Sequence, residues 1–403
     1  LRQDTMTAWT IRSLADAPRQ ATLDYQSVAG ESLQYFDSAI WQTYIRRIGP
    51  ENVRCIWQDE RFAGGLAFYR TGQWYGGKQI PCAAVSGVAI EPAARGSGAC
   101  KYLLQQTLLE LHRERMPLAS LYASTQRLYR SVGFEHSGYH FDYSLPMSSL
   151  ACDRGARSLA ATRMVEPPFD LLEKISTTRN LRSQGNLQRT SGMWERIVNP
   201  IGGTSSTYVL GPAEVPEGYI TLRHGKRSDG YPQALVATDF VANTPRALQR
   251  MIALILDHRS MCDVFNWSGG PQDPLLLAAS EERVQTMLLL HTLNRIVCVK
   301  EAFEQRGFSD SLNGELHLFV EDPLLQENNG NWILKVEAGR PQVHQGGEGK
   351  LRMNVRALTP LYTSLLSSHQ LVDLGLIECA CTKQLDLADR LFAGPAPWTC
   401  EIF

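Results

Sequence analysis

A Gly-rich turn between an apolar strand and a helix is the segment of this sequence whose residue types point most directly to a ligand. Residues 85–99 read VSGVAIEPAARGSGA, and Gly96 and Gly98 stand directly before a run with leucines at helical spacing. The first turn of a helix leaves backbone N–H groups without intrahelical partners, and the helix dipole adds partial positive charge there. Glycines let an anion approach the backbone closely, and the Arg95 guanidinium can add a charge-assisted hydrogen bond. The turn therefore predicts a phosphate or pyrophosphate site.

The spacing of the turn excludes two familiar phosphate-binding motifs. The lysine and Ser/Thr of a P-loop do not follow Gly98, and no G-x-G-x-x-G with a later acidic residue is present. A plain connecting turn remains the alternative interpretation, since a Gly-rich turn before a helix is often only a connection. The elements on either side of the turn help to distinguish a phosphate site from a connecting turn.

Those elements follow an α/β order around a central mixed sheet. Apolar runs with β-branched residues predict buried strands, and apolar residues at i, i+4 and i+7 predict helices. The predicted elements are, in order, a helix over 36–48, a hairpin of strands 53–58 and 64–70, a strand over 83–90, a helix after the turn, a strand over 118–123, a helix over 126–132 and a strand over 139–145.

The segment from about residue 80 to 145 resembles the core of the GNAT superfamily of N-acetyltransferases. The stretch LYRSVGF at 128–134 matches the second motif of that family and has Tyr129 in the family's usual position. The turn departs at one place, because Ala93 stands where the family commonly has Gln or Arg. The resemblance implies acetyl-CoA as the co-substrate, with its pyrophosphate at the turn.

The expected cofactor site includes the end of the strand as well as the turn. Backbone N–H groups around residues 88–90 can hold the oxyanion that forms during acyl transfer. Ser124 can touch the acetyl or pantetheine portion, or it can cap the next helix. The predicted cofactor-binding residues are Val88, Ala89, Ile90, Arg95, Gly96, Ser97, Gly98, Ala99 and Ser124.

The chain of 403 residues is too long for one such domain. Three domains are expected, at 1–150, 151–285 and 286–403, and the fold class is α/β and α+β. The second domain is predicted to have strands over 218–222, 234–240 and 264–267 and a helix over 245–257, without a comparable turn. The third is predicted to have a helix running from 284 towards 303, strands over 316–320, 332–336 and 351–355, and helices over 359–367 and 385–392.

This order is similar to that of the Eis (enhanced intracellular survival) acetyltransferases. In that family a GNAT domain, a degenerate GNAT-like domain and a sterol-carrier-protein-like domain occur together. The later signatures are looser than the turn and include LNRIV at 293–297, Leu391-Phe392 and the final segment 395–403. The resemblance covers essentially the whole chain.

The predicted strand over 83–90 contains no acidic residue, although many GNAT enzymes place a catalytic Glu there. Glu91 stands directly before Pro92 and is expected to face solvent. The Eis resemblance implies another base, the terminal carboxylate, which here belongs to Phe403. A frayed chain end is the alternative, because terminal residues are often poorly ordered.

Tyr129 is the predicted general acid for the coenzyme A sulfur, because a phenol keeps its proton at neutral pH. Packing in the core is the alternative role for a Tyr on a helix. Glu401 and Trp41 are the predicted substrate-binding residues, since carboxylates and aromatic faces suit a cationic amine. Trp41 also fits a core position. His136 and His140 are interpreted as exposed strand residues without a catalytic role.

Composition excludes several classes of protein. Hydrophobic residues make up 43% and charged residues 20%, with 40 basic and 41 acidic side chains, so charge favours neither nucleic acid nor an anionic membrane as partner. No apolar run approaches the roughly 18–20 residues that span a bilayer, and no signal peptide is recognised. The nine cysteines are scattered and no His has metal-ligand spacing, so we expect no metal and a cytoplasmic location.

The predicted function is an acetyl-CoA-dependent N-acetyltransferase. By resemblance its acceptor is an aminoglycoside-like or other polyamine, and its assembly is a homo-oligomer, specifically a hexamer. Two alternatives remain open, a protein-lysine acetyltransferase and a lipid or acyl-CoA binding module without turnover.

Overall fold

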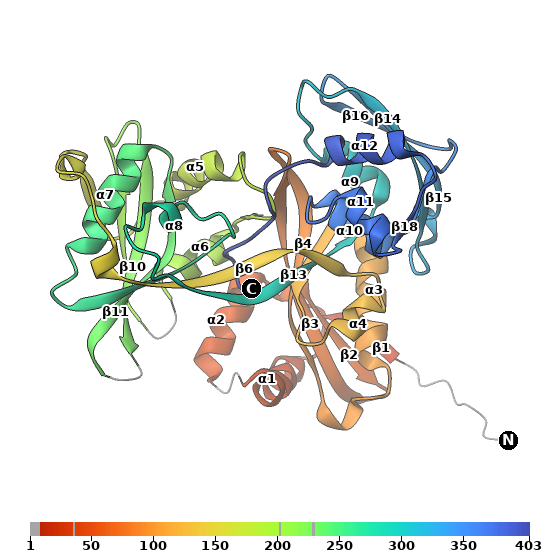
Figure 1. Ribbon diagram of the computed structural model, residues 1–403. Helices are drawn as coiled ribbons and strands as arrows, with labels where there is room; N and C mark the ends of the chain where they lie inside the picture. Colours follow the sequence, from red (N-terminus) through yellow and green to blue (C-terminus); the bar gives the residue numbers. More distant parts are fainter. Residues whose placement is uncertain (1–8, 35–36, 201–202, 228–229) are drawn as a thin grey trace.

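One long sheet connects the first two predicted domains in the computed structural model, which describes residues 9–34, 37–200, 203–227 and 230–403. Thirteen of the described strands form it, in the order β1-β2-β3-β4-β5-β13-β6-β12-β11-β10-β9-β7, with β8 paired to β3. The long strands β6 and β13 run across the middle of the molecule and join its two halves (Figure 1). A separate five-stranded sheet, β16-β15-β14-β17-β18, lies in the third predicted domain.

The first domain has the predicted order of elements. Phe36, at the start of the first predicted helix, lies outside the described residues, and the helix itself begins at Ser38, where the Asp37 carboxylate accepts from two backbone N–H groups. The elements are β1 (Trp9–Ser13), α1 (Gln20–Leu33), α2 (Ser38–Ile48), β2 (Val53–Gln58), β3 (Arg61–Tyr75), β4 (Lys78–Ile90), α3 (Ala99–Arg113), β5 (Leu118–Tyr122), α4 (Gln126–Arg130) and β6 (Glu135–Pro146).

The second domain also has the predicted strands and its amphipathic helix, and it adds further short elements. Thr244 caps the helix α7 with its side chain, and Pro245 occupies the first position, where a missing N–H costs nothing. The elements are β7 (Ala161–Met164), α5 (Phe169–Asn180), β8 (Leu187–Gln188), α6 (Ser191–Val198), β9 (Ser206–Leu210), β10 (Gly218–Arg227), β11 (Gly230–Ala242), α7 (Pro245–Leu256), β12 (Cys262–Gly269) and α8 (Pro274–Ala278).

The helix predicted from residue 284 is wrong over most of its length. Residues Gln285–Ile296 form strand β13, which pairs with both β5 and β6, and a helix begins only at Val299. The second half of β13 is buried on both faces. A strand in the middle of a sheet reads as a continuous apolar run, which periodicity cannot distinguish from a helix.

The third domain packs helices on its smaller sheet. The predicted strand over 351–355 ends at Asn354, whose side chain caps a helix over Val355–Tyr362, so the helix predicted at 359–367 starts and ends earlier than expected. Strand β16 is not among the predicted elements. The elements are α9 (Val299–Gln305), β14 (Gly314–Glu321), β15 (Gly330–Glu337), β16 (Arg340–Gln345), β17 (Leu351–Asn354), α10 (Val355–Tyr362), α11 (Ser368–Asp373), β18 (Ile377–Glu378) and α12 (Thr382–Leu391).

The C-terminal segment after α12 leaves the third domain and returns to the centre of the molecule, where the chain end lies beside β6 and β13 (Figure 1). Backbone hydrogen bonds hold this segment in place: Tyr139 N–H donates to the Pro397 carbonyl and Thr399 N–H to the Tyr139 carbonyl, both at 3.1 Å. None of the helices in the described ranges has the length and apolar content to cross a membrane.

Candidate active site

Strand β4 separates from β5 in the middle of the sheet. The two strands are parallel and pair only over Cys82–Ala84 and Leu118–Ser120, so within the described residues β4 has no ladder partner on that side from Val85 onward. Backbone N–H groups along this part of β4 are available to a ligand. The separation creates the opening in which a cofactor can lie between the two strands.

A β-bulge lies on β4 at the same place. Gly65 and Ala67 of β3 pair with Ala89 and Ser86, so one residue of β3 faces two residues of β4. Gly87 has a φ of 62°, and its carbonyl accepts a 2.6 Å hydrogen bond from the Tyr25 hydroxyl. A bulge redirects the backbone, and such irregularities concentrate next to active sites.

The Gly-rich turn is exposed and open. Gly96 and Gly98 have φ values of 78° and 90°, and a Cβ added at either would meet no atom within 4 Å. Helix α3 starts at Ala99, and its N-cap residue is Gly98, which has no side chain to cap the helix. Arg95 is exposed and donates to Ser32 Oγ at 2.9 Å, which ties the turn to α1. This geometry fits an anion such as a pyrophosphate.

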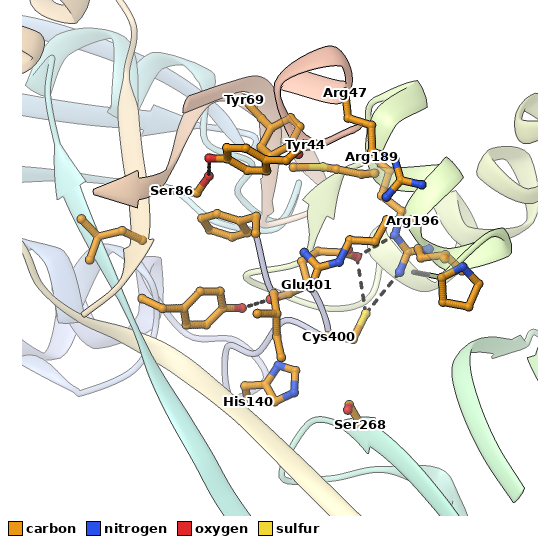
Figure 2. Close-up of a pocket in the computed structure, with 18 of the residues that line it drawn as sticks. Tyr44, Arg47, Tyr69, Ser86, His140, Arg189, Arg196, Ser268, Cys400 and Glu401 are labelled. Carbon is orange, nitrogen blue, oxygen red and sulfur yellow. Dashed lines mark hydrogen bonds and ion pairs between the residues drawn. The ribbon is translucent and has the colours of Figure 1, made fainter. Parts of the chain in front are cut away.

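A cavity of about 650 Å³ opens between β4, α2, α6 and the C-terminal residues (Figure 2). It brings together the predicted residues Trp41, Val88, Ser124, Tyr129, Glu401 and Phe403. Ala89, Ile90, Arg95, Gly96, Ser97, Gly98 and Ala99 do not line it, because they lie further along β4 and in the turn. The predicted site residues thus divide into a cavity and an adjacent open turn.

Tyr129 lies on α4 and is 4% exposed, with its ring 6.1 Å from that of Phe134. Burial raises the pKa of the Tyr129 phenol well above its usual value, and the charge of Cys100 adds to this, while a hydrogen bond with Ser124 opposes it. The hydroxyl therefore keeps its proton throughout the working range of pH. Ser124 does not cap α4, since the capping position is Thr125.

Phe403 lies in the cavity wall. Its ring is 5.0 Å from that of Tyr122, and its side chain packs against a core cluster that includes Trp41 and Met193. The Tyr122 hydroxyl donates to the Glu401 carbonyl. The frayed chain end considered as an alternative is therefore not what the structure has.

Glu401 is part of a buried ionic network. Arg189 Nε lies 2.6 Å from Glu401 Oε1, and Arg189 Nη1 lies 2.5 Å from Asp239 Oδ2, with all three side chains nearly buried. Burial opposes ionisation of Asp239, but the charges of Arg189 and Arg179 outweigh it and lower its pKa to about 2. The Glu401 carboxylate thus lines the cavity already paired with a cation.

Trp41 has the core position offered as its alternative role, at 2% exposed, and it also lines the cavity, so its binding of a substrate stays a prediction. Its ring is 4.8 Å from Tyr25 and 5.3 Å from Tyr44, and its indole N–H has no acceptor among the described residues. The expectation that both histidines are exposed is wrong: His140 is buried and lines the cavity, and the half-buried His136 stacks on His291 at 4.5 Å.

Sequence reasoning missed the basic residues of this cavity. Arg47, Arg189, Arg196 and Arg223 all line it, and they come from α2, the segment before α6, α6 and β10. Single arginines scattered over 180 residues carry no motif, so only the fold reveals them. No group of three or more His, Cys, Asp or Glu side chains in the described part of the chain is arranged to hold a metal ion.

Known protein families match three parts of the chain. Two acetyltransferase (GNAT) domain models match residues 10–137 and 185–296, and a sterol carrier protein domain model matches residues 299–400. The matches agree with the predicted sequence of two GNAT domains and a sterol-carrier-like domain. The borders predicted at residues 150 and 285 stay predictions.

Several known proteins are similar to this chain in sequence or fold over most of their length. The N-acetyltransferase Eis of Mycobacterium tuberculosis and of Mycobacterium bovis is 25% identical over 350 residues, which cover 79% of this chain and 79% of the relative. A GCN5-related N-acetyltransferase from Anabaena variabilis is 30% identical with a TM-score of 0.93, over 98% of this chain and 100% of that one. Eis1 from Mycobacterium abscessus has the same fold, with a TM-score of 0.80 at 20% identity over 98% and 100% of the two chains.

Proposed function

Because the chain belongs to the GCN5-related N-acetyltransferases, with the two GNAT domains and sterol-carrier-like domain of the Eis family, we propose that it acetylates an amine held in the cavity beside β4. Acetyl-CoA supplies the acetyl group as a thioester. Tyr129 is proposed to stabilise the leaving sulfur, and the Phe403 carboxylate to accept the proton of the amine. The observation that carries the proposal is that both residues line one cavity although they are far apart in the sequence.

The proposed cofactor site extends from the turn to the bulge. The backbone of residues 96–99 would hold the pyrophosphate, since glycines with nothing in front of them precede a helix without a side-chain cap. The unpaired side of β4 at Val88–Ile90 would hold the pantetheine arm and the carbonyl oxygen by backbone hydrogen bonds. Ser124 would lie between Tyr129 and the acetyl group.

The proposed base is a carboxylate that stays ionised. An α-carboxyl group titrates at about 3.3–3.7, so it is an anion at neutral pH and a weak base unless a closed site raises its proton affinity. Phe403 lines the cavity with its ring against Tyr122, which supports a role for its carboxylate beside the acceptor amine. A water between carboxylate and amine can relay the proton.

The proposed role of Tyr129 follows from its raised pKa. A thiol of ordinary pKa, about 8.5, is a stronger acid than this buried phenol, so complete proton transfer to the sulfur is unfavourable. Donating a hydrogen bond to the sulfur as negative charge develops there needs no such transfer. Tyr129 therefore acts as a proton donor mainly through this hydrogen bond.

Thiol release from acetyl-CoA in the presence of an amine panel, with the acetylated product identified by mass, tests the proposal. The panel contains an aminoglycoside, simple diamines and a lysine peptide, so that the predicted polyamine acceptor and a protein-lysine acceptor are both included. Transfer to any amine supports the enzyme. Acetyl-CoA binding without thiol release from any amine would favour the acyl-CoA binding module instead.

The lipid-carrier alternative has less support from the third domain. The face between its sheet and helices is filled by a contiguous apolar core that includes Leu318, Leu334, Leu358 and Tyr362. A second cavity of about 370 Å³ lies at the margin of that core, between the β3–β4 turn, the segments after α5 and α9, and the end of α12. The hexameric assembly stays a prediction by resemblance, and the cytoplasmic location a prediction from the sequence.

A further inference from the structure

The cavity that would hold the amine has more cationic than anionic side chains. Arg47, Arg189, Arg196 and Arg223 line it, whereas Glu401 is the single acidic side chain of the described lining. In Figure 2, the labelled arginines Arg47, Arg189 and Arg196 gather on the same side of the cavity, away from Ser86. A site for a polycation is expected to have the opposite balance of charge.

The internal ion pairs leave part of this positive charge uncompensated. Glu401 and Asp239 neutralise Arg189. Arg47 has a side chain only 6% exposed, with Nη2 3.4 Å from Glu195, and its Nε has no hydrogen-bond partner among the described residues. Arg196 and Arg223 form no ion pair with any described residue, and guanidinium groups stay charged at every working pH.

These arginines lie on the side of the cavity opposite the proposed cofactor site. They belong to α2, α6 and β10, whereas Val88 and Tyr129 belong to β4 and α4. The phosphates of the cofactor would bind at the turn, which does not line this cavity. The arginines are therefore free to contact the acceptor.

Thr238 links the two elements that carry Arg196 and Arg223. Its hydroxyl lies 3.2 Å from the Ile197 carbonyl at the end of α6 and 3.3 Å from the Thr221 carbonyl on β10. Arg196 directly precedes Ile197, and Arg223 lies two residues after Thr221 on the same strand. The end of α6 and the middle of β10 are thus joined where both arginines enter the cavity lining.

We propose that the acceptor is an amine that also carries an anionic group, a carboxylate or a phosphate, which Arg196 and Arg223 bind with help from Arg47. This inference rests on the proposed acetyltransferase function and narrows its substrate class. Planar guanidinium groups match carboxylate and phosphate oxygens with paired, charge-assisted hydrogen bonds. Aromatic rings of Trp41, Tyr44 and Tyr69 in the same lining suit an apolar or ring-containing body.

Matched pairs of amines test the proposal, because each pair differs only in the anionic group. Tyrosine and tyramine form the carboxylate pair, glucosamine 6-phosphate and glucosamine form the phosphate pair, and kanamycin serves as the polycation. We expect kcat/KM, measured by thiol release, to be higher for the anionic member by about tenfold or more in one of the pairs. The pair that shows this difference identifies the anionic group of the acceptor as a carboxylate or a phosphate. Equal or higher kcat/KM for the members that lack the anionic group, or for kanamycin, would overturn the proposal.

Two variants connect the preference to the named residues. Arg196→Gln and Arg223→Gln should each reduce the ratio of kcat/KM within the favoured pair by about tenfold. Arg163→Gln, an exposed arginine on β7 that does not line the cavity, is the control and should keep the ratio. An unchanged ratio in both cavity variants would also contradict the proposal.

Calorimetry distinguishes failure of this inference from failure of the proposed function. Each amine is titrated into the full-length protein saturated with coenzyme A, so binding is measured without turnover. If no amine releases thiol but the anionic members bind more tightly than their partners, the acetyltransferase proposal fails and the anion preference stands. Equal binding within both pairs, or no binding of any anionic member, refutes the preference itself.

Discussion

At the scale of single residues, the chemistry depends on a phenol that keeps its proton and a carboxylate that has lost it. Tyr129 is buried, and burial favours the neutral phenol more strongly than the hydrogen bond with Ser124 opposes it. Phe403 lines the same cavity, and its terminal carboxylate is the proposed base. A proton donor and a proton acceptor on opposite sides of a reacting amine and thioester are what acyl transfer needs.

Replacing Tyr129 by Phe removes only the hydroxyl and keeps the ring packed against Phe134. Without a hydrogen bond to the leaving sulfur, kcat should fall by about a hundredfold or more, while KM for the amine should change little. Steady-state thiol release measures both. Tyr208→Phe on β9, which does not line the cavity, is the control and should behave as the unmodified protein. A Tyr129→Phe variant with normal kcat would rule out this role.

At the scale of elements, caps and ion pairs hold the parts of the site in place. Asp273 caps α8 by accepting from Leu275 N–H at 3.0 Å, and it is almost fully buried. Burial raises its pKa to about 7. Asp239, in contrast, is kept ionised by two arginines. The two carboxylates show that partners, and not burial alone, decide the charge state.

Asp273→Asn should stabilise the protein at high pH. The folded state keeps the Asp273 proton up to about pH 7, whereas the unfolded chain releases it from about pH 3.9, so the free energy of unfolding falls between these values and is level above them. An Asn side chain still accepts the capping hydrogen bond, and because it does not ionise, it avoids this loss of free energy of unfolding. Urea unfolding should show a gain on the order of 4 kcal/mol at pH 8 and almost none at pH 4. A gain in stability that is the same at both pH values would contradict the raised pKa of Asp273.

The ion pair between Arg189 and Glu401 links the C-terminal segment to the second domain, and we expect it to position Phe403. Glu401→Gln keeps the size of the side chain but removes the charge that Arg189 binds at 2.6 Å. Arg189 still has Asp239, so we expect a loss of only about 1–3 kcal/mol in the free energy of unfolding. If Glu401 positions Phe403, kcat falls while KM for acetyl-CoA stays the same. A variant with normal kcat would show that Phe403 needs no such anchor.

Patterns within short stretches of sequence predicted most elements of the first domain. The strand, turn and helix around Gly96 and Gly98 are where the pattern placed them, and so are β5, α4 and β6. Strand β13 was misread as a helix because pairing on both sides makes its apolar run continuous. The Asn354 side chain caps α10, so this helix begins at Val355, where the alternating pattern of the preceding strand predicts that the strand continues.

At the scale of the whole molecule, the cavity is assembled from parts that no local pattern connects. Tyr129 was found through a motif, but Arg47, Arg196 and Arg223 stand alone in the sequence and meet only in the fold. The sheet that continues through both GNAT domains brings α6 and β10 towards β4. The chain end then returns from the third domain to complete the wall (Figure 1).

The most direct test of the central claim is kcat for a variant with one alanine appended after Phe403. The extra residue moves the terminal carboxylate away from its place and leaves every side chain unchanged. Acetyl-CoA binding should be normal, since the turn at Gly96 and Gly98 does not line the cavity. We predict that kcat falls by about a hundredfold or more, as expected for loss of a general base. An unchanged kcat would show that the Phe403 carboxylate is not the base.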